Sequence, residues 1–142
     1  MVNALDGRRL DIQHPDYPAH FLTGRIRVQV NYNDLAHASV TVVAVCDPWL
    51  YSRREKVYTV VATAEEQTLT LTNRGRRTVV PQAVVTGDSS ADSVLLKCGT
   101  VSLAMGPGTY KLPDLLLPTG STVVTCSGTG AVKISYREAV LR

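Results

Sequence analysis

The chain has 142 residues, 44% of them hydrophobic and 19% charged, with a formal net charge of +3. These values suit one folded domain, or one domain with part of a second, and they exclude a disordered chain. A weak net charge gives no strong attraction to nucleic acid or to an anionic membrane surface. No early apolar segment follows a basic start, and no apolar run approaches the length of a membrane span. We therefore expect a chain that is neither signal-sorted nor membrane-spanning.

The first 30 residues predict three different local structures in succession. Val2–Leu5 predicts one helical turn, which Gly7 would end. Residues 13–18 contain two prolines, which exclude a helix there. Beyond Gly24, apolar and polar residues alternate, which predicts a strand with one solvated face. The alternating residues are Arg25, Ile26, Arg27, Val28, Gln29 and Val30.

The segment 38–46 is apolar on both faces apart from two hydroxyl side chains, which is typical of a central strand. Residues 31–34 form part of the predicted hairpin connection to it. The pattern breaks at residues 47–49, Asp-Pro-Trp, and a short charged stretch follows at 52–56. We predict a module boundary here, between residues 52 and 53.

The rest of the chain predicts short strands separated by turn residues. The expected strands are 57–63, 68–72, 79–86, 94–98, 101–104, 109–112, 122–126 and 132–136. Turns at intervals of about 8–12 residues are typical of an antiparallel β-sandwich or barrel. No segment after residue 10 has a helical period. The predicted fold class is all-β.

The cysteines Cys46, Cys98 and Cys126 are odd in number and widely spaced. This pattern fits neither a disulfide framework nor a metal knuckle, so it predicts free, buried thiols formed in a reducing cytoplasm. A cysteine nucleophile assembled by the fold is the alternative, but no histidine or acid is linked to any of the three in sequence.

No catalytic motif is present, and the three histidines lie at irregular spacing in the first quarter. His14, Asp16 and His20 are either a metal site or a surface turn, and the two prolines among them favour the turn. Asp88 and Asp92 are either calcium ligands or part of a solvated loop; two ligands are fewer than calcium usually gathers. We therefore expect no enzyme, no catalytic or metal site and no cofactor.

A basic turn at residues 74–77 contains Arg74, Arg76 and Arg77. Binding of nucleic acid would call for interleaved aromatic residues or a recognition helix, and neither is present. The arginines are either solvated or in contact with carboxylates of a neighbouring subunit.

The aromatic residues make a sugar-binding site an alternative interpretation, because such a site presents an aromatic face beside polar groups. The candidates are Trp49, Tyr51, Tyr58, Tyr110 and Tyr136. Trp49 and Tyr51 fall at the predicted boundary, where an anchor between two modules is the simpler interpretation. Tyr136 alternates with Val132 and Ile134, so we expect it to face a core.

The order of several short motifs resembles the later part of bacteriophage distal tail proteins, which belong to the tail tips of long-tailed phages. Each motif is weak alone, and together they extend over nearly the whole chain. They are Asn3–Leu10, Asp16-Tyr17, Gly24-Arg25 at the start of a strand, Asp47–Tyr51, Leu71–Gly75 followed by Val79–Pro81, Gly108–Pro113 and Gly128–Glu138.

This resemblance implies that residues 1–52 are the C-terminal part of a ring (belt) domain and that 53–142 form a galectin-like β-sandwich domain. It further implies a homohexameric ring between a tail tube protein and a tail-tip protein, located at the virion's tail tip after assembly in the bacterial host cytoplasm. The likeness to galectins concerns the fold and carries no sugar-binding claim.

Family members have ring-domain strands before the position at which this chain begins. The strand edges around residues 25–46 would therefore lack partners, and we expect another chain to close them. The expected subunit interface includes segments 25–31 and 38–46 and the residues Arg25, Arg27, Arg74, Arg76 and Arg77. The alternative functions are a carbohydrate-binding module for attachment to the host surface and, third, a tail-associated hydrolase.

Overall fold

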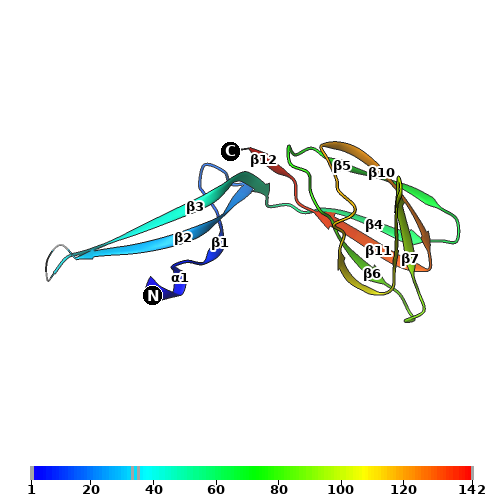
Figure 1. Ribbon diagram of the computed structural model, residues 1–142, viewed down its shortest axis with the longest axis horizontal. Helices are drawn as coiled ribbons and strands as arrows, with labels where there is room; N and C mark the ends of the chain where they lie inside the picture. The colour runs from blue at the N-terminus through cyan, green and yellow to red at the C-terminus, as the bar shows by residue number, and fades with distance from the viewer. Residues whose placement is uncertain (1, 33, 35, 142) are drawn as a thin grey trace. The chain divides into compact units, whose positions relative to one another are not determined.

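The structure, a computed structural model, describes residues 2–32, 34 and 36–141. It is built from antiparallel strands, with one short helix, α1 (Val2–Leu5), near the N-terminus (Figure 1). The strands are β1 (Arg9–Ile12), β2 (His20–Tyr32), β3 (Ala38–Ser52), β4 (Lys56–Ala62), β5 (Gln67–Asn73), β6 (Gln82–Thr86), β7 (Val94–Cys98), β8 (Val101–Met105), β9 (Gly108–Lys111), β10 (Gly120–Gly128), β11 (Gly130–Tyr136) and β12 (Ala139–Leu141). The predicted all-β fold class is confirmed.

The strands form three sheets, with the orders β1-β2-β3-β12, β5-β10-β7-β8 and β4-β11-β6-β9. The chain divides into two compact units. Unit 1 comprises Met1–Arg53 with Leu141–Arg142, and unit 2 comprises Arg54–Val140. None of the helices among the described residues is long and apolar enough to cross a membrane.

Unit 2 is an antiparallel β-sandwich with a closed apolar core. Its strands alternate between buried and exposed side chains, as a strand with one face on a core must. In β10, for example, Val124 and Cys126 are fully buried while Val123 is 56% exposed. Sixteen buried apolar residues form one cluster, which includes Leu71, Ile134 and Tyr136. The prediction that Tyr136 faces a core is confirmed.

Unit 1 is a long hairpin of β2 and β3 with a small support at its base. β1 pairs with β2 from Arg9↔Arg25 to Ile12↔Leu22. Gly7, at a φ of 76°, ends α1 and donates its N–H to the Ile26 carbonyl at 2.8 Å. The Asp6 carboxylate accepts the N–H of Val28 at 3.1 Å. These contacts fasten the N-terminal segment to the edge of β2 opposite β3.

The hairpin register shifts at its base. Leu22 pairs with Leu50, but Gly24 pairs with Cys46, so β3 carries two more residues than β2 across this step. The inserted segment is Asp-Pro-Trp, in which Pro48 has no N–H to donate to the ladder. A Cβ on Gly24 would lie 2.6 Å from the Val45 carbonyl oxygen, which explains glycine at the partner position. β3 therefore continues through the break to Ser52 instead of ending at Cys46.

Several sequence expectations need correction in detail. The predicted strand 79–86 begins only at Gln82, because Pro81 has no N–H; Val79 makes a single bridge to Leu117. The predicted central strand 38–46 is exposed from Ala38 to Val45. The short strands β1 and β12 were not predicted. Asn33, part of the predicted hairpin connection, lies outside the described residues.

Candidate assembly surface

One face of the β2–β3 hairpin, here called the apolar face, carries apolar side chains on both strands. Residues directly opposite each other in an antiparallel pair share a face, and the face alternates along the strand. The pairs on this face are Gly24↔Cys46, Ile26↔Ala44, Val28↔Val42, Val30↔Val40 and Tyr32↔Ala38. Ile26, near the base, is only 9% exposed, whereas Val42 is 57%, Val40 60% and Tyr32 81% exposed.

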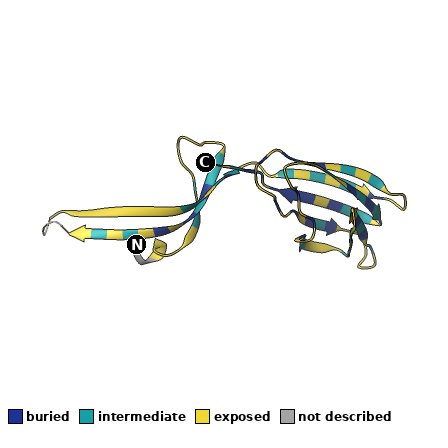
Figure 2. Cartoon of the chain, turned by 45° about the horizontal axis from the view of Figure 1, so that its top comes forward, coloured by how far each residue is buried: buried dark blue, intermediate teal, exposed yellow. Residues whose placement is uncertain are grey.

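Exposure of the hairpin increases away from its base. Figure 2 shows β3 exposed along most of its length, whereas the strands of unit 2 alternate between buried and exposed residues. A two-stranded ribbon has no second layer to cover its apolar face, and such ribbons are marginal alone in water. Contiguous exposed apolar surface of this kind marks an interaction site in a soluble protein.

The opposite face of the hairpin is mixed. It holds the pairs Arg25↔Val45 and Arg27↔Val43, followed toward the tip by polar pairs. Val45 is 67% and Val43 50% exposed, and both arginines are exposed. The predicted interface residues Arg25 and Arg27 thus lie beside exposed valines, an arrangement suited to a partner that offers both carboxylates and apolar surface.

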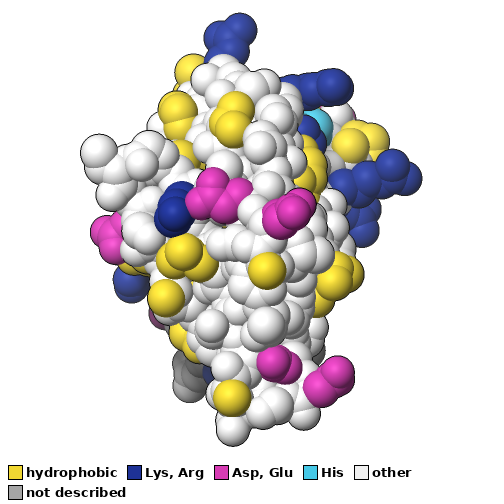
Figure 3. Space-filling view, turned by 90° about the vertical axis from the view of Figure 1, so that its right-hand side faces the viewer, with side chains coloured by type: hydrophobic (Ala, Val, Ile, Leu, Met, Phe, Trp, Pro, Cys, Tyr) yellow, Lys and Arg dark blue, Asp and Glu magenta, His cyan; other side chains and the backbone are white. Residues whose placement is uncertain are grey.

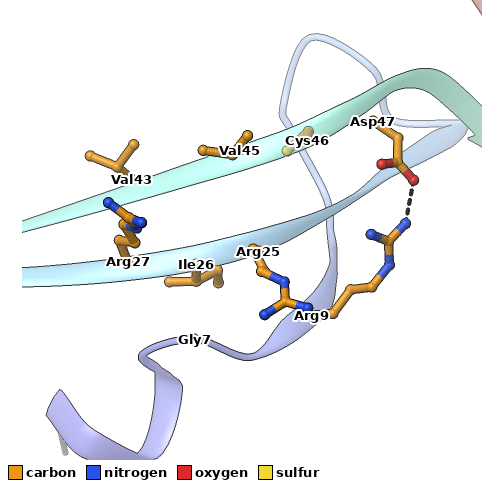
Figure 4. A pocket seen from close by; sticks show the side chains of 9 residues that line it. All are labelled: Gly7, Arg9, Arg25, Ile26, Arg27, Val43, Val45, Cys46 and Asp47. Atoms are coloured by element: carbon orange, nitrogen blue, oxygen red, sulfur yellow. Dashed lines mark hydrogen bonds and ion pairs between the residues drawn. The ribbon is translucent and has the colours of Figure 1, made fainter.

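A hollow of about 710 Å³ lies near the hairpin base, and residues of both faces line it. Gly7, Arg9, Arg25, Ile26, Arg27, Val43, Val45, Cys46 and Asp47 line it (Figure 4). Arg9 forms an ion pair with Asp47, which joins β1 to the inserted segment of β3. This pair could not be predicted from local sequence patterns, because the two residues are 38 positions apart.

The outer edge of β3 is also open. β12 is the neighbour of β3 on that side, but it has three residues against fifteen in β3. Most of this edge therefore lacks a partner strand among residues 2–32, 34 and 36–141. Unpaired backbone N–H and C=O groups along a strand are a template for pairing with another chain.

Local hydrogen bonds link the described residues Asp34, Ala36 and His37, which lie between β2 and β3. The Asp34 carboxylate accepts the N–H groups of Ala36 and His37, each at 2.7 Å, and contacts the His37 ring at 2.9 Å. The Ala36 N–H, followed by the His37 side chain, holds the pKa of Asp34 below its usual value.

The two predicted boundary residues lie on the last part of β3. Tyr51 stacks on Phe21 with ring centroids 5.5 Å apart and an interplanar angle of 24°. Trp49 and Tyr51 are both half-buried. Leu22 and Leu50, which pair beside them, are buried, so this cluster is the small core of unit 1. Their role as an anchor between modules stays a prediction.

The predicted basic turn lies in unit 2, directly after β5, and is held by Asn73. This side chain is 1% exposed; its amide donates to the carbonyls of Arg77 and Leu117, at 2.8 and 2.9 Å, and its oxygen accepts the Gly75 N–H at 2.9 Å. The Arg76 N–H donates to the Ala139 carbonyl at 2.8 Å. The turn backbone is thus rigid, while the side chains of Arg74, Arg76 and Arg77 are exposed.

A second network beside this turn was not predicted. The Tyr136 hydroxyl donates to the Thr72 carbonyl at 2.6 Å, and the Glu138 carboxylate accepts the Arg74 N–H at 2.6 Å and pairs with Lys56 at 2.8 Å. Burial raises the pKa of Tyr136. Burial alone would raise the pKa of Glu138 too, but the Arg74 N–H and the Lys56 ammonium outweigh it and lower the pKa. The network ties β4, β5 and β11 to the basic turn.

The remaining candidates are not assembled into sites. His14 contacts Asp16 at 3.6 Å. The part of the chain that the structure describes contains no group of three or more His, Cys, Asp or Glu able to hold a metal ion. Cys46, Cys98 and Cys126 are free, as expected, but of these only Cys126 is buried, and burial raises its pKa.

The aromatic residues considered for sugar stacking offer no open face together. Tyr136 is 3% exposed and stacks on Tyr58 at 6.1 Å. Tyr110 is half-buried and donates its hydroxyl to the Gly106 carbonyl at 3.0 Å. Tyr58, Tyr110 and Tyr136 thus serve mainly in the packing of unit 2.

The chain was compared with known proteins. No protein-family model matches it, and no curated protein is similar in sequence. Its structure is similar to the crystal structure of the SPP1 Dit protein (gp 19.1), described as a paradigm of the hub adsorption apparatus in phages that infect Gram-positive bacteria. The TM-score is 0.56 and the identity 17%, over 98% of this chain and 69% of that one. The resemblance to phage distal tail proteins suggested by the sequence motifs is therefore shown at the level of the fold.

Proposed function

We propose that this chain is a structural protein of a long-tailed phage tail tip, whose copies assemble through the β2–β3 hairpin. The observation that supports this proposal most directly is the exposed apolar face of the hairpin. On this face Val40 is 60% and Val42 57% exposed, beside an open strand edge. The similarity of fold to a phage hub protein supports this role. The function requires surfaces for other chains and no reactive groups.

In this proposal, residues 1–52 are the later part of a ring domain and residues 53–142 a galectin-like sandwich. A homohexameric ring joins the tail tube to the tail-tip protein that contacts the host. Such a ring needs two different surfaces on each copy, because its interface is heterologous and rotationally closed. The apolar face supplies one surface; the mixed face with Arg25 and Arg27, or the edge of β3, supplies another. The ring is assembled in the host cytoplasm and ends in the virion.

The proposal is tested by removing apolar surface from the hairpin without adding charge. The double variant Val40→Ser/Val42→Ser should weaken self-association about a hundredfold, because each buried valine contributes roughly 1.5 kcal/mol. Sedimentation velocity over a concentration series measures the association, and negative-stain images show whether rings form.

The matched control is Val57→Ser/Val123→Ser, with both residues on strands of unit 2. These side chains are 47% and 56% exposed, close to the values in the hairpin. The control should assemble as the wild type does. Monomeric wild-type protein at high micromolar concentration, or equal losses in both variants, would refute assembly through the hairpin.

A further inference from the structure

The β-sandwich of unit 2 has loops of opposite charge at its two ends. β4 ends at Ala62 opposite Gly130, and β6 ends at Thr86 opposite Ala131, so the loops 63–66, 87–93 and 129 lie at one end. These loops contain Glu65, Glu66, Asp88 and Asp92 and no Lys, Arg or His. Figure 3, which views this end, shows several Asp and Glu side chains across it. We call it the acidic end.

The opposite end of the same sandwich carries the basic turn. Asn73 pairs with Gly120 and Lys56 with Tyr136 there, so the loops 74–81, 113–119 and 137–138 lie at this end. These loops carry four arginines and two acids, namely Arg74, Arg76, Arg77 and Arg137, and Asp114 and Glu138. Glu138 is already paired with Lys56. We call it the basic end.

The acidic end is hollowed, not flat. A depression of about 450 Å³ is lined by Val61, Thr86, Gly87, Asp88, Asp92, Gly130 and Ala131. Val61 is 68% exposed and gives it an apolar wall. The Asp92 carboxylate is held by the Ser89 N–H at 3.1 Å and packs so closely on Gly87 that a Cβ there would lie 2.6 Å from the Asp92 Cβ.

This combination suits a long basic side chain better than a metal ion. An arginine has an aliphatic stem for an apolar wall and a planar cation for carboxylates. Two aspartates are too few for a calcium site, and no larger ligand group exists among the described residues. Glu66 is already paired with Lys97 at 2.8 Å, which leaves Glu65, Asp88 and Asp92 as the acids that face a partner.

The basic end offers a matching projection. The hydrogen bonds of Asn73, the Arg76 N–H and the Thr119 hydroxyl, which donates to the Gly75 carbonyl at 2.7 Å, pin the turn backbone. A rigid turn loses little entropy on binding, so exposed Arg74 and Arg76 are preorganised for a contact. Both complementary surfaces belong to every copy of the chain.

We infer that the acidic end of one sandwich binds the basic turn of a second copy, head to tail, with Arg76 entering the acidic depression. This contact goes beyond assembly through the hairpin and uses different residues. It is heterologous, so it runs around a ring in one direction or continues as a filament. It weakens as salt rises, because its charges are near the surface.

The test exchanges charges between the two ends of the full chain, in the Val40→Ser/Val42→Ser background so that hairpin contacts do not contribute. One variant carries Arg74→Glu/Arg76→Glu and the other Glu65→Lys/Asp88→Lys. Each alone should associate about tenfold more weakly than its parent at low salt, because like charges then meet. An equimolar mixture should recover association, because the acidified turn of one variant meets the lysine-substituted acidic end of the other.

Lys133→Glu, an exposed residue in the middle of β11, serves as the charge control and should leave association unchanged. Recovery in the mixture also shows that both variants are folded. Two results would overturn the inference: unchanged association in either charge-exchanged variant, or a mixture no tighter than its components. A failure here leaves the hairpin proposal standing, since the hairpin is tested separately with unaltered sandwich ends.

Discussion

The hairpin of unit 1 and the sandwich of unit 2 use valine-rich strands in opposite ways. In β11, Val132 and Ile134 are fully buried beneath the facing sheet. In β3, Val40 and Val42 stand on an equally apolar face and remain more than half exposed. The sandwich buries its apolar residues within one chain, whereas the hairpin leaves them exposed and available to another chain. Burial of a strand therefore depends on a second layer and not on its composition.

The largest difference between the two regions should appear in the free energy of unfolding. Ile134→Ala should cost about 3 kcal/mol, because it leaves a cavity in a closed core. Val42→Ala should change the stability of the monomer by less than about 0.5 kcal/mol, because the side chain already contacts water. Urea unfolding at the lowest usable concentration measures both. Similar losses of unfolding free energy in the two variants would contradict this difference between the sandwich and the hairpin.

The next effect concerns buried hydrogen bonds. Asn73→Ala should cost about 2 kcal/mol, because it removes the three hydrogen bonds of this buried side chain to Arg77, Leu117 and Gly75. Asn31→Ala, on the exposed hairpin, is the matched control and should have no measurable effect. Thermal unfolding of both variants provides the comparison. A harmless Asn73→Ala would mean that the basic turn is not held as described.

A third test acts on the hairpin base. A Cβ on Gly24 would approach the backbone of Val45 and Cys46 to within 2.6–2.8 Å, so Gly24→Ala should cost about 1 kcal/mol in unit 1. Gly106→Ala is the control, because its nearest contact would be at 3.9 Å. Limited proteolysis of the hairpin should quicken in the first variant and not in the second. Equal rates would argue against the register shift.

The smallest expected effect is on pH dependence. The pKa of Glu138 is lower in the folded protein than its ordinary value of 4.5, so its contribution to stability is present above that pH and is lost as the pH falls below it. Glu138→Gln should therefore lower the Tm by a few degrees at pH 7, and the gap should close near pH 3. A gap that persists at pH 3 would show that the carboxylate charge is not the cause.

The strands of unit 2 could be predicted closely from the sequence, because alternation and turn residues are local signals. The pairing Val79↔Leu117 and the hydrogen bond from Asn73 to Leu117 could not, since their partners lie about 40 residues apart. The apolar pattern of 38–46 predicted a central strand because, in sequence, an uncovered apolar strand looks the same as a covered one. Alternation predicted that Arg25 and Arg27 lie on the solvated face of a strand, and their role in an interface stays a prediction. Nothing in the sequence indicated that Arg9 pairs with Asp47.

The most direct test of assembly through the hairpin is hydrogen–deuterium exchange of the wild-type chain at a series of concentrations. If copies cover one another's hairpins, amides of segment 38–46 should become protected as concentration rises, while those of β10 and β11 stay equally protected throughout. Fast exchange in 38–46 at every concentration, up to the solubility limit, would contradict the account.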